Sequence, residues 1–185
     1  MNAETIAEAL ALTSRRLEGA GISELRLESR LLVGLALGLT PEYVFSHPEQ
    51  ALDDAARRRL GEIVGRRARR EPMAHITGER EFWSLPFTVN AHTLIPRPDS
   101  ETLIEAVLDA CPDSKGGARI LDLGTGSGCL LLALLHERAD WTGIGLDRSA
   151  AALDVAAANA KALGLAERSE FVLGDWARKP IGELG

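Results

Sequence analysis

The sequence predicts an α/β chain in which an N-terminal helical bundle (residues 1–75) is followed by a β-hairpin linker (76–98) and the first half of a Rossmann-like parallel sheet (99–185). Two observations indicate this fold class. Apolar residues recur at helical spacing through the first part, and from Ala118 onward short apolar runs alternate with helical stretches. Strands that alternate with helices pair in parallel through right-handed crossovers, so we expect parallel strands over 118–123, 141–147 and 169–175.

The bundle is predicted from the positions of its apolar residues and its caps. Thr40 is the expected N-cap of a short helix that begins at Pro41, and Asp53 or Asp54 opens the next helix. That helix runs into the basic run 66–70 (RRARR), which we interpret as a solvated helix face. The first two helices are indicated by residues that recur every three or four positions: Ile6, Leu10, Thr13 and Leu17, then Leu27, Leu31, Leu32 and Leu35.

Composition excludes several functional classes. The net charge of −6 does not suit a globally basic nucleic-acid binder. The two cysteines, Cys111 and Cys129, form no CxxC pair, so we expect no disulfide framework and a cytoplasmic location. The four histidines lack metal-ligand spacing, and we expect no metal site. The N-terminus is not a signal peptide and the leucine-rich stretch 25–39 is broken by charges, so no membrane association is expected.

The segment between the bundle and the sheet has two features. EFWSLPFTVN (81–90) carries aromatic and β-branched residues on both sides of Leu85-Pro86, which indicates a β-hairpin or a pair of short strands. In IPRPDSE (95–101), two prolines hold an extended backbone around Arg97, and Asp99 or Ser100 can cap the helix that follows.

A glycine-rich loop, DLGTGSG (122–128), joins the first strand of the sheet to a helix over 128–138. Its glycines remove Cβ atoms where the backbone must turn tightly and touch a ligand, and the helix offers N–H groups to polar ligand atoms. Asp147 closes the next strand, where a carboxylate can accept both ribose hydroxyls of an adenosine. The expected cofactor-binding residues of the loop are Gly124, Thr125, Gly126, Ser127 and Gly128.

The loop favours S-adenosylmethionine over a dinucleotide. The dinucleotide fingerprint G-x-G-x-x-G would need glycine at position 129, where this chain has Cys129. Asp122, which enters the loop, suits a cofactor with a cationic amino-acid end better than a pyrophosphate. A glycine-rich turn without a ligand is the remaining alternative. After the third strand, Asp175 can accept from an adenine amino group and Trp176 can stack on the purine, unless Trp176 is a half-buried surface residue.

With these motifs in place, the chain resembles the glutamine methyltransferases that modify peptide-chain release factors (the PrmC/HemK type). The narrowest part of the resemblance is the block with REFW, a hairpin and IPRP-acid-x-E upstream of the loop. Two mild departures occur there: Ser100 stands where the family usually has Thr, and Asp99 replaces the usual Glu. The matching segments are 71–101, 122–134 (DLGTGSGCLLLAL), 145–160 (GLDRSAAALDVAAANA) and 174–176 (GDW).

The resemblance implies methyl transfer from S-adenosylmethionine to the side-chain amide nitrogen (N5) of the glutamine in the GGQ motif of release factors. It implies that the loop, Asp147 and Trp176 contact the cofactor, and that the bundle recognises the protein substrate. It also implies that Arg97, Pro98 and Glu101 line the cleft. A structural ion pair between Arg97 and Glu101 is an equally good interpretation of these two residues.

One family motif is missing. The family carries NPPY after the fourth strand of the sheet, but Asn2, Asn90 and Asn159 are the asparagines of this chain and none precedes a proline. The Asn side chain and a backbone carbonyl of NPPY are suited to accept both N–H groups of the target amide and orient its nitrogen. We therefore expect an N-terminal portion of a longer enzyme that has no catalytic residue of its own, is inactive alone and binds the cofactor weakly or not at all.

Three further expectations complete the sequence-based interpretation. Without a fourth strand, the first strand of the sheet would be an edge. Asn159 is expected on a helix surface near the sheet. Two other functions stay open: amino methylation of a nucleic-acid base, which the bundle, the REFW–IPRP block and the acidic balance disfavour, and a non-catalytic binding fragment.

Overall fold

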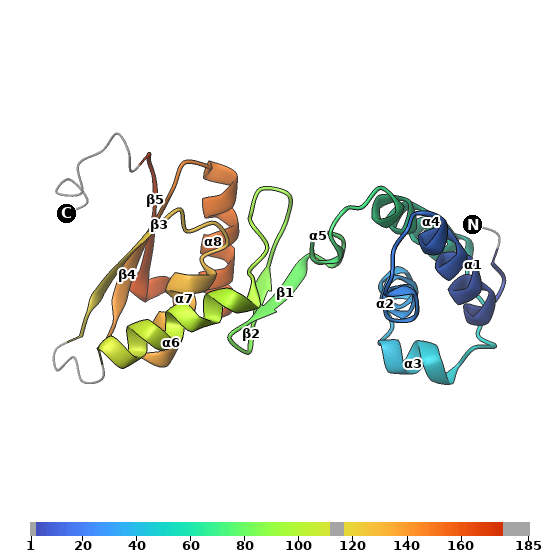
Figure 1. Ribbon diagram of the computed structural model, residues 1–185, viewed down its shortest axis with the longest axis horizontal. Coiled ribbons are helices and arrows are strands. Elements are labelled where there is room, and N and C mark those ends of the chain that lie inside the picture. The colour runs from blue at the N-terminus through green and yellow to red at the C-terminus, as the bar shows by residue number, and fades with distance from the viewer. Residues whose placement is uncertain (1–2, 112–116, 176–185) are drawn as a thin grey trace. The chain divides into compact units, whose positions relative to one another are not determined.

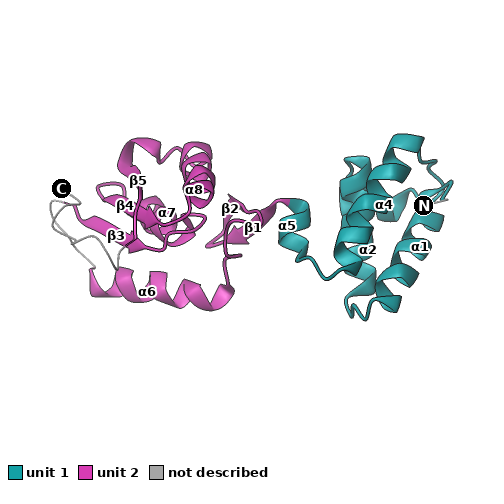
Figure 2. Cartoon of the chain, turned by 90° about the horizontal axis from the view of Figure 1, so that it is seen from above, with its two compact units in different colours: residues 1–77 teal, residues 78–185 magenta. Residues whose placement is uncertain are grey.

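The computed structural model describes residues 3–111 and 117–175, and the chain divides into two compact units, 1–77 and 78–185 (Figure 2). In the described part of the chain, no helix combines the length and the apolar character needed to span a bilayer.

The first unit is helical (Figure 1). Thr40 and Asp53 are the N-caps of α3 and α4, as predicted, and each accepts the backbone N–H three residues further on. The core contains fully buried Ile6, Leu17 and Leu60. The helices are α1 (Ile6–Gly19), α2 (Leu25–Leu37), α3 (Pro41–Ser46), α4 (Asp54–Ala68) and α5 (Met73–Thr77).

The basic run 66–70 at the end of α4 is bound inside this unit. Arg67 forms a two-pronged ion pair with Glu28 of α2, at 2.7 and 2.9 Å. Arg66 donates to the Glu71 carboxylate at 2.9 Å, and Arg70 donates to the carbonyl of Ala20 at 2.9 Å. The interpretation of the run as a solvated helix face is therefore wrong for Arg67, whose side chain is 16% exposed in its ion pair, whereas Arg69 and Arg70 are exposed.

The second unit begins with the hairpin of β1 (Glu79–Phe82) and β2 (Leu85–Thr88). Its turn lies at Trp83 and Ser84, whose φ angles are 53° and 56°, and not at Leu85-Pro86. Two consecutive positive φ angles define the type I′ turn, which matches the twist of a hairpin. Pro86 lies inside β2, which a two-stranded hairpin tolerates because each strand has a free edge.

The sheet of the second unit is parallel and has the strand order β3 (Arg119–Leu123), β4 (Thr142–Asp147), β5 (Ser169–Leu173). The crossover helices α7 (Cys129–Glu137) and α8 (Ala150–Ala162) lie on the same face of it (Figure 1). Helix α6 (Glu101–Ala110) precedes the sheet and follows a 3-10 turn over Pro98–Ser100; a second such turn covers Ala166–Arg168. The predicted fold class is confirmed, and among the described strands β3 pairs only with β4.

The core of this unit includes residues of the hairpin. Phe82 and Phe87 are buried in the same cluster as Trp141 and α7, and their ring centroids lie 6.3 Å apart. The hairpin therefore packs as part of the sheet unit.

The end of α7 is held by a different group. The Arg168 guanidinium donates to the carbonyls of Leu135, Arg138 and Trp141 at 2.7–2.9 Å.

Candidate cofactor site

The glycine-rich loop is fixed to the carboxyl end of β4. The amides of Gly124 and Thr125 donate to the Leu146 carbonyl at 2.8 and 3.0 Å, and the Gly128 amide donates to the Thr125 carbonyl at 2.8 Å. Gly124, Gly126 and Gly128 have φ angles of 82°, 56° and 80°, a region that residues with a Cβ adopt only with strain. A Cβ on Gly124 would have no neighbour within 4 Å, and one on Gly126 would have only a carbonyl oxygen at 3.9 Å. The loop backbone is thus open on this side.

Asp147, at the end of β4, joins the loop to the edge of the sheet. One carboxylate oxygen accepts from the Gly126 amide at 2.9 Å, and the other accepts from the Ser149 amide at 2.9 Å. Each carboxylate oxygen has a second lone pair, so the group can still accept two hydroxyl groups of a ligand. The carboxylate lies where a diol next to the loop would meet it.

A second carboxylate lies at the base of the loop. The Thr125 hydroxyl donates to Asp122 at 2.7 Å. Burial raises the pKa of the Asp122 carboxyl above its ordinary value, the hydrogen bond from Thr125 lowers that pKa, and the charge of Asp147 raises it again. A nearby cation would favour the ionised form of Asp122, so this end of the loop suits a ligand with a positive group.

The remaining predicted cofactor residues differ in what they expose. The Gly174 amide donates to the Asp147 carbonyl at 2.9 Å, which places exposed Asp175 just past β5 at the same carboxyl edge. Ser127 is only 2% exposed and Thr125 only 5%, so these two residues shape the loop from inside, and the exposed surface of the loop belongs to its other residues. The prediction for Trp176 lies outside the described residues.

Of the residues predicted to line the cleft, Glu101 lies at the hairpin turn. Glu101 accepts from the Trp83 amide at 2.9 Å, and the Trp83 indole donates to Glu137 at 2.7 Å. Arg97 and Pro98 are exposed. In the described part of the chain no ion pair joins Arg97 to Glu101, so the alternative of an Arg97–Glu101 ion pair is wrong. Glu101 instead stabilises the hairpin turn.

Asn159 was expected on the helix surface, and this expectation is wrong. The residue is 1% exposed, and its amide hydrogen-bonds to the backbone of Thr88 and Ser127. A signal was present in the sequence, because the buried residues of α8 recur at helical spacing: Ala152, Val155, Ala156 and Asn159.

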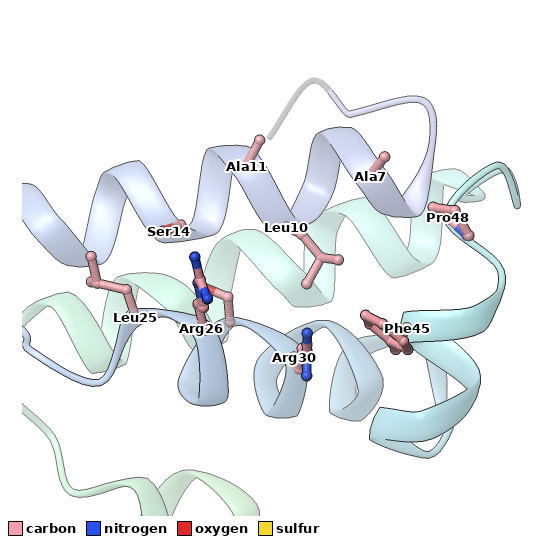
Figure 3. Close-up of a pocket in the computed structure, with 10 residues that line it drawn as sticks. Ala7, Leu10, Ala11, Ser14, Leu25, Arg26, Arg30, Phe45 and Pro48 are labelled. Atoms are coloured by element: carbon pink, nitrogen blue, oxygen red, sulfur yellow. The ribbon is translucent and has the colours of Figure 1, made fainter.

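The helical unit has a separate pocket of about 570 Å³ between α1, α2 and α3 (Figure 3). Leu10 and Leu25 line it together with two arginines, Arg26 and Arg30. Phe45 also lines it and is 65% exposed, and the Arg30 guanidinium lies 4.6 Å from the centre of its ring. The pocket is apolar with a cationic rim. In residues 3–111 and 117–175, no group of three or more His, Cys, Asp and Glu side chains could hold a metal ion.

These elements define the class of this protein, an S-adenosylmethionine-dependent methyltransferase domain. They are the strand β3, the glycine-rich loop, the helix α7 and the acidic residue that ends β4, and the described part of the domain contains the strands β3 to β5. Two family models match the chain, "PrmC N-terminal domain" over residues 8–78 and "Methyltransferase domain" over residues 114–182. The chain belongs to the release factor glutamine methyltransferase family, the PrmC/HemK type.

Relatives with the name release factor glutamine methyltransferase support this assignment. The protein from Rhodospirillum rubrum is 45% identical over 170 residues, which cover 90% of this chain and 51% of that protein. The protein from Bradyrhizobium diazoefficiens is 43% identical over 171 residues, 91% of this chain and 58% of that protein. The chain therefore spans about half the length of the curated relatives it matches. A solved methyltransferase from Geobacter sulfurreducens in complex with S-adenosyl-L-homocysteine is 32% identical over 47% of this chain and 32% of that chain, but its TM-score of 0.38 adds nothing to the assignment.

Proposed function

We propose that the chain binds S-adenosylmethionine at the carboxyl edge of β3–β5, as part of an enzyme that methylates the N5 nitrogen of the GGQ glutamine in peptide-chain release factors. The observation that carries the proposal is the Asp147 carboxylate, which accepts from the Gly126 amide at 2.9 Å and so lies directly beside the glycine loop. Family membership supplies the reaction.

The described residues fit this cofactor. Asp147 would accept the ribose hydroxyls, and the open backbone at Gly124 and Gly126 would allow the cofactor to approach closely. Asp122 would attract the cationic amino-acid end, and Asp175 would accept from the adenine amino group, with Trp176 stacked on the purine. When bound, the cofactor supplies a methyl group on a positively charged sulfur.

Methyl transfer needs a group that holds the target amide. An amide nitrogen is a poor nucleophile, so acceptors must orient its two N–H groups for in-line attack. The 185 residues contain no Asn-Pro pair. We propose that the acceptors lie in a segment beyond these residues, that residues 1–185 alone do not methylate, and that they bind the cofactor weakly. Arg97, Pro98 and Glu101 would border the substrate path.

The helical unit is proposed to dock the release factor. Its pocket offers an exposed aromatic ring, Phe45, beside Arg26 and Arg30, which suits an acidic or mixed protein surface. Charge reversal of both arginines should weaken release factor binding at least fivefold. Arg59→Glu is the matched control, because Arg59 is exposed and lies outside the pocket.

The cofactor step is tested by calorimetric titration with S-adenosylhomocysteine. We compare residues 1–185, the same chain extended by the segment of the Rhodospirillum relative that lies outside the 170 matched residues, and an Asp147→Asn variant of each. The matched control is Asp154→Asn, which changes an exposed carboxylate of α8. We expect tighter binding by the extended protein and a loss of binding in Asp147→Asn only. Equal affinities of Asp147→Asn and the parent would contradict the proposed site.

The reaction is tested with methyl-labelled cofactor and a release factor, with a GGQ→GGA release factor as the negative substrate. The extended protein should label only the GGQ substrate, and residues 1–185 alone should label neither. Labelling of a nucleic acid in place of the release factor would overturn the proposed substrate. Turnover by residues 1–185 alone would overturn the proposal that they lack the amide acceptors.

A further inference from the structure

We infer that Asn159 is a positioning residue that couples the β1–β2 hairpin, and the IPRP segment after it, to the cofactor loop. The inference builds on the proposed function only in taking 122–128 as the cofactor loop. Asn159 lies on α8, distant in sequence from both segments that it joins.

The Asn159 amide holds three backbone groups at once. The Thr88 amide donates to Asn159 Oδ1 at 2.8 Å, and Asn159 Nδ2 donates to the Thr88 carbonyl at 3.0 Å. The second Nδ2 hydrogen goes to the Ser127 carbonyl at 2.9 Å. The side chain therefore pairs with Thr88 as a neighbouring strand would, and uses its remaining donor on the loop.

Few other side chains could replace it. Asn159 is 1% exposed, so water has little access to the three backbone groups if the amide is removed. Aspartate has the same shape but no donor when ionised, and it would face two carbonyl oxygens. Leucine has a similar volume but neither donor nor acceptor. Both a donor pair and an acceptor are needed at this position.

On the hairpin side, the hydrogen bonds of Asn159 to Thr88 fix the start of the segment that leads to Arg97. The next residue, Val89, is buried, and its amide donates to the Gly78 carbonyl at 2.9 Å. Asn90 then forms a turn in which its side chain accepts from the His92 amide at 2.9 Å and its carbonyl accepts from Thr93 at 3.0 Å. The chain from Thr88 to Thr93, two residues before the IPRP segment, is thus held by successive hydrogen bonds that begin at Asn159.

On the loop side, the hydrogen bond from Asn159 to the Ser127 carbonyl fixes the last turn before α7. Ser127 precedes Gly128, whose φ angle is 80° and whose amide closes the loop onto the Thr125 carbonyl at 2.8 Å. A Cβ on Gly128 would lie 3.1 Å from Leu132 of α7 and 3.2 Å from Ala156 of α8, so the Gly128 backbone packs closely against both helices. A shift of Ser127 would therefore move the loop as a whole.

The test uses backbone hydrogen exchange of the ligand-free 185-residue chain, followed by NMR. We compare Asn159→Ala with Leu165→Ala, a core variant of the same unit, at temperatures equally far below each melting point. We expect Asn159→Ala to speed exchange at the Thr88, Gly126 and Gly128 amides at least tenfold over the control, with β4 amides unchanged. Asn159→Ser is the milder variant, measured in the same way if the alanine variant does not fold.

Two results would overturn the inference: exchange that rises uniformly across the unit, or a rise at Thr88 with no change in the loop. The variants are also titrated with S-adenosylhomocysteine in the extended protein, where Asn159→Ala should bind at least fivefold more weakly than Leu165→Ala. If the parent does not bind this probe, the proposed cofactor fails, while the exchange data still decide whether Asn159 couples the two segments.

Discussion

Gly145→Ala is the substitution that best tests how the loop is seated on the sheet. Gly145 lies in β4, beneath the loop. A Cβ there would lie 2.8 Å from the Thr125 hydroxyl and 2.9 Å from two carbons of the Phe171 ring. All these distances are well below van der Waals contact. Thr125 is buried and hydrogen-bonded to Asp122 at 2.7 Å, so it has little freedom to move.

The expected magnitude follows from these contacts. Overpacking of one methyl group in a close-packed site costs about 1–3 kcal/mol. If Thr125 moves away from Asp122, the lost hydrogen bond to a charged group adds about 1.5 kcal/mol or more. We therefore expect a loss of roughly 3 kcal/mol in the free energy of unfolding of the second unit. For a unit of this size, that corresponds to a drop in Tm of more than about 10 °C.

Tryptophan fluorescence during thermal unfolding measures this effect selectively, because Trp83, Trp141 and Trp176 all lie after residue 77. The matched control is Gly19→Ala in α1, where a Cβ has no neighbour within 4 Å, so it should not lower stability; because residues 1–77 contain no tryptophan, this control is followed by circular dichroism. A Tm of Gly145→Ala within about 2 °C of the parent would refute the reasoning, because it would show that Thr125 and Phe171 yield at little cost.

Three further predictions concern charged groups. Glu101→Ala should lower the free energy of unfolding of the second unit by about 1.5 kcal/mol, because the Trp83 amide in the strained turn loses its hydrogen-bond acceptor. Tryptophan fluorescence during unfolding in urea measures this change. An unchanged midpoint of the urea transition would contradict this role of Glu101. Burial raises the pKa of Asp122, so its ionised form costs stability at neutral pH and the cost disappears as pH falls through the raised pKa. Asp122→Asn should therefore gain more stability over the parent at pH 7 than at pH 4, and a constant difference would argue against this. Glu28→Gln should lower the free energy of unfolding of the helical unit by about 3 kcal/mol, measured by circular dichroism. The substitution leaves Arg67 without its charged partner at a site where the Glu28 and Arg67 side chains are only 11% and 16% exposed. Asp54→Asn, which removes the exposed ion pair of Asp54 with Arg57, should change this stability little.

The repeating elements could be predicted from the sequence because each has a local signal. The cap Thr40 was correct, and Asp53, one of the two residues predicted to open α4, is its N-cap, since a cap depends only on the residues that follow it. The predicted cap of α6 was wrong, because Ser100 occupies the N-cap position without a side-chain hydrogen bond. The strands of the sheet were found within two residues of their observed ends, because short apolar runs between helices have few other interpretations.

The contacts that shape the site could not be predicted in this way. The hairpin was predicted, but its turn at Trp83 and Ser84 was not located, because tryptophan is not typical of turns and Glu101 stabilises the turn at Trp83 from a different element. The arginines of the basic run were assigned to solvent because their partners, such as Glu28, are far away in the sequence. Long-range polar pairs leave no periodic pattern.

The candidate site therefore depends on a few polar side chains more than on the apolar core. Glu101 holds the turn of the hairpin, Asn159 joins the hairpin to the loop, and Asp147 joins the loop to the sheet. Each side chain binds backbone at a turn, in the loop or at the end of a strand, so its loss would displace one segment without opening the hydrophobic cluster around Trp141. Substitution of these residues should consequently weaken cofactor binding more than equally destabilising changes in the core do, because binding requires the loop, the sheet edge and the hairpin to be in register at the same time.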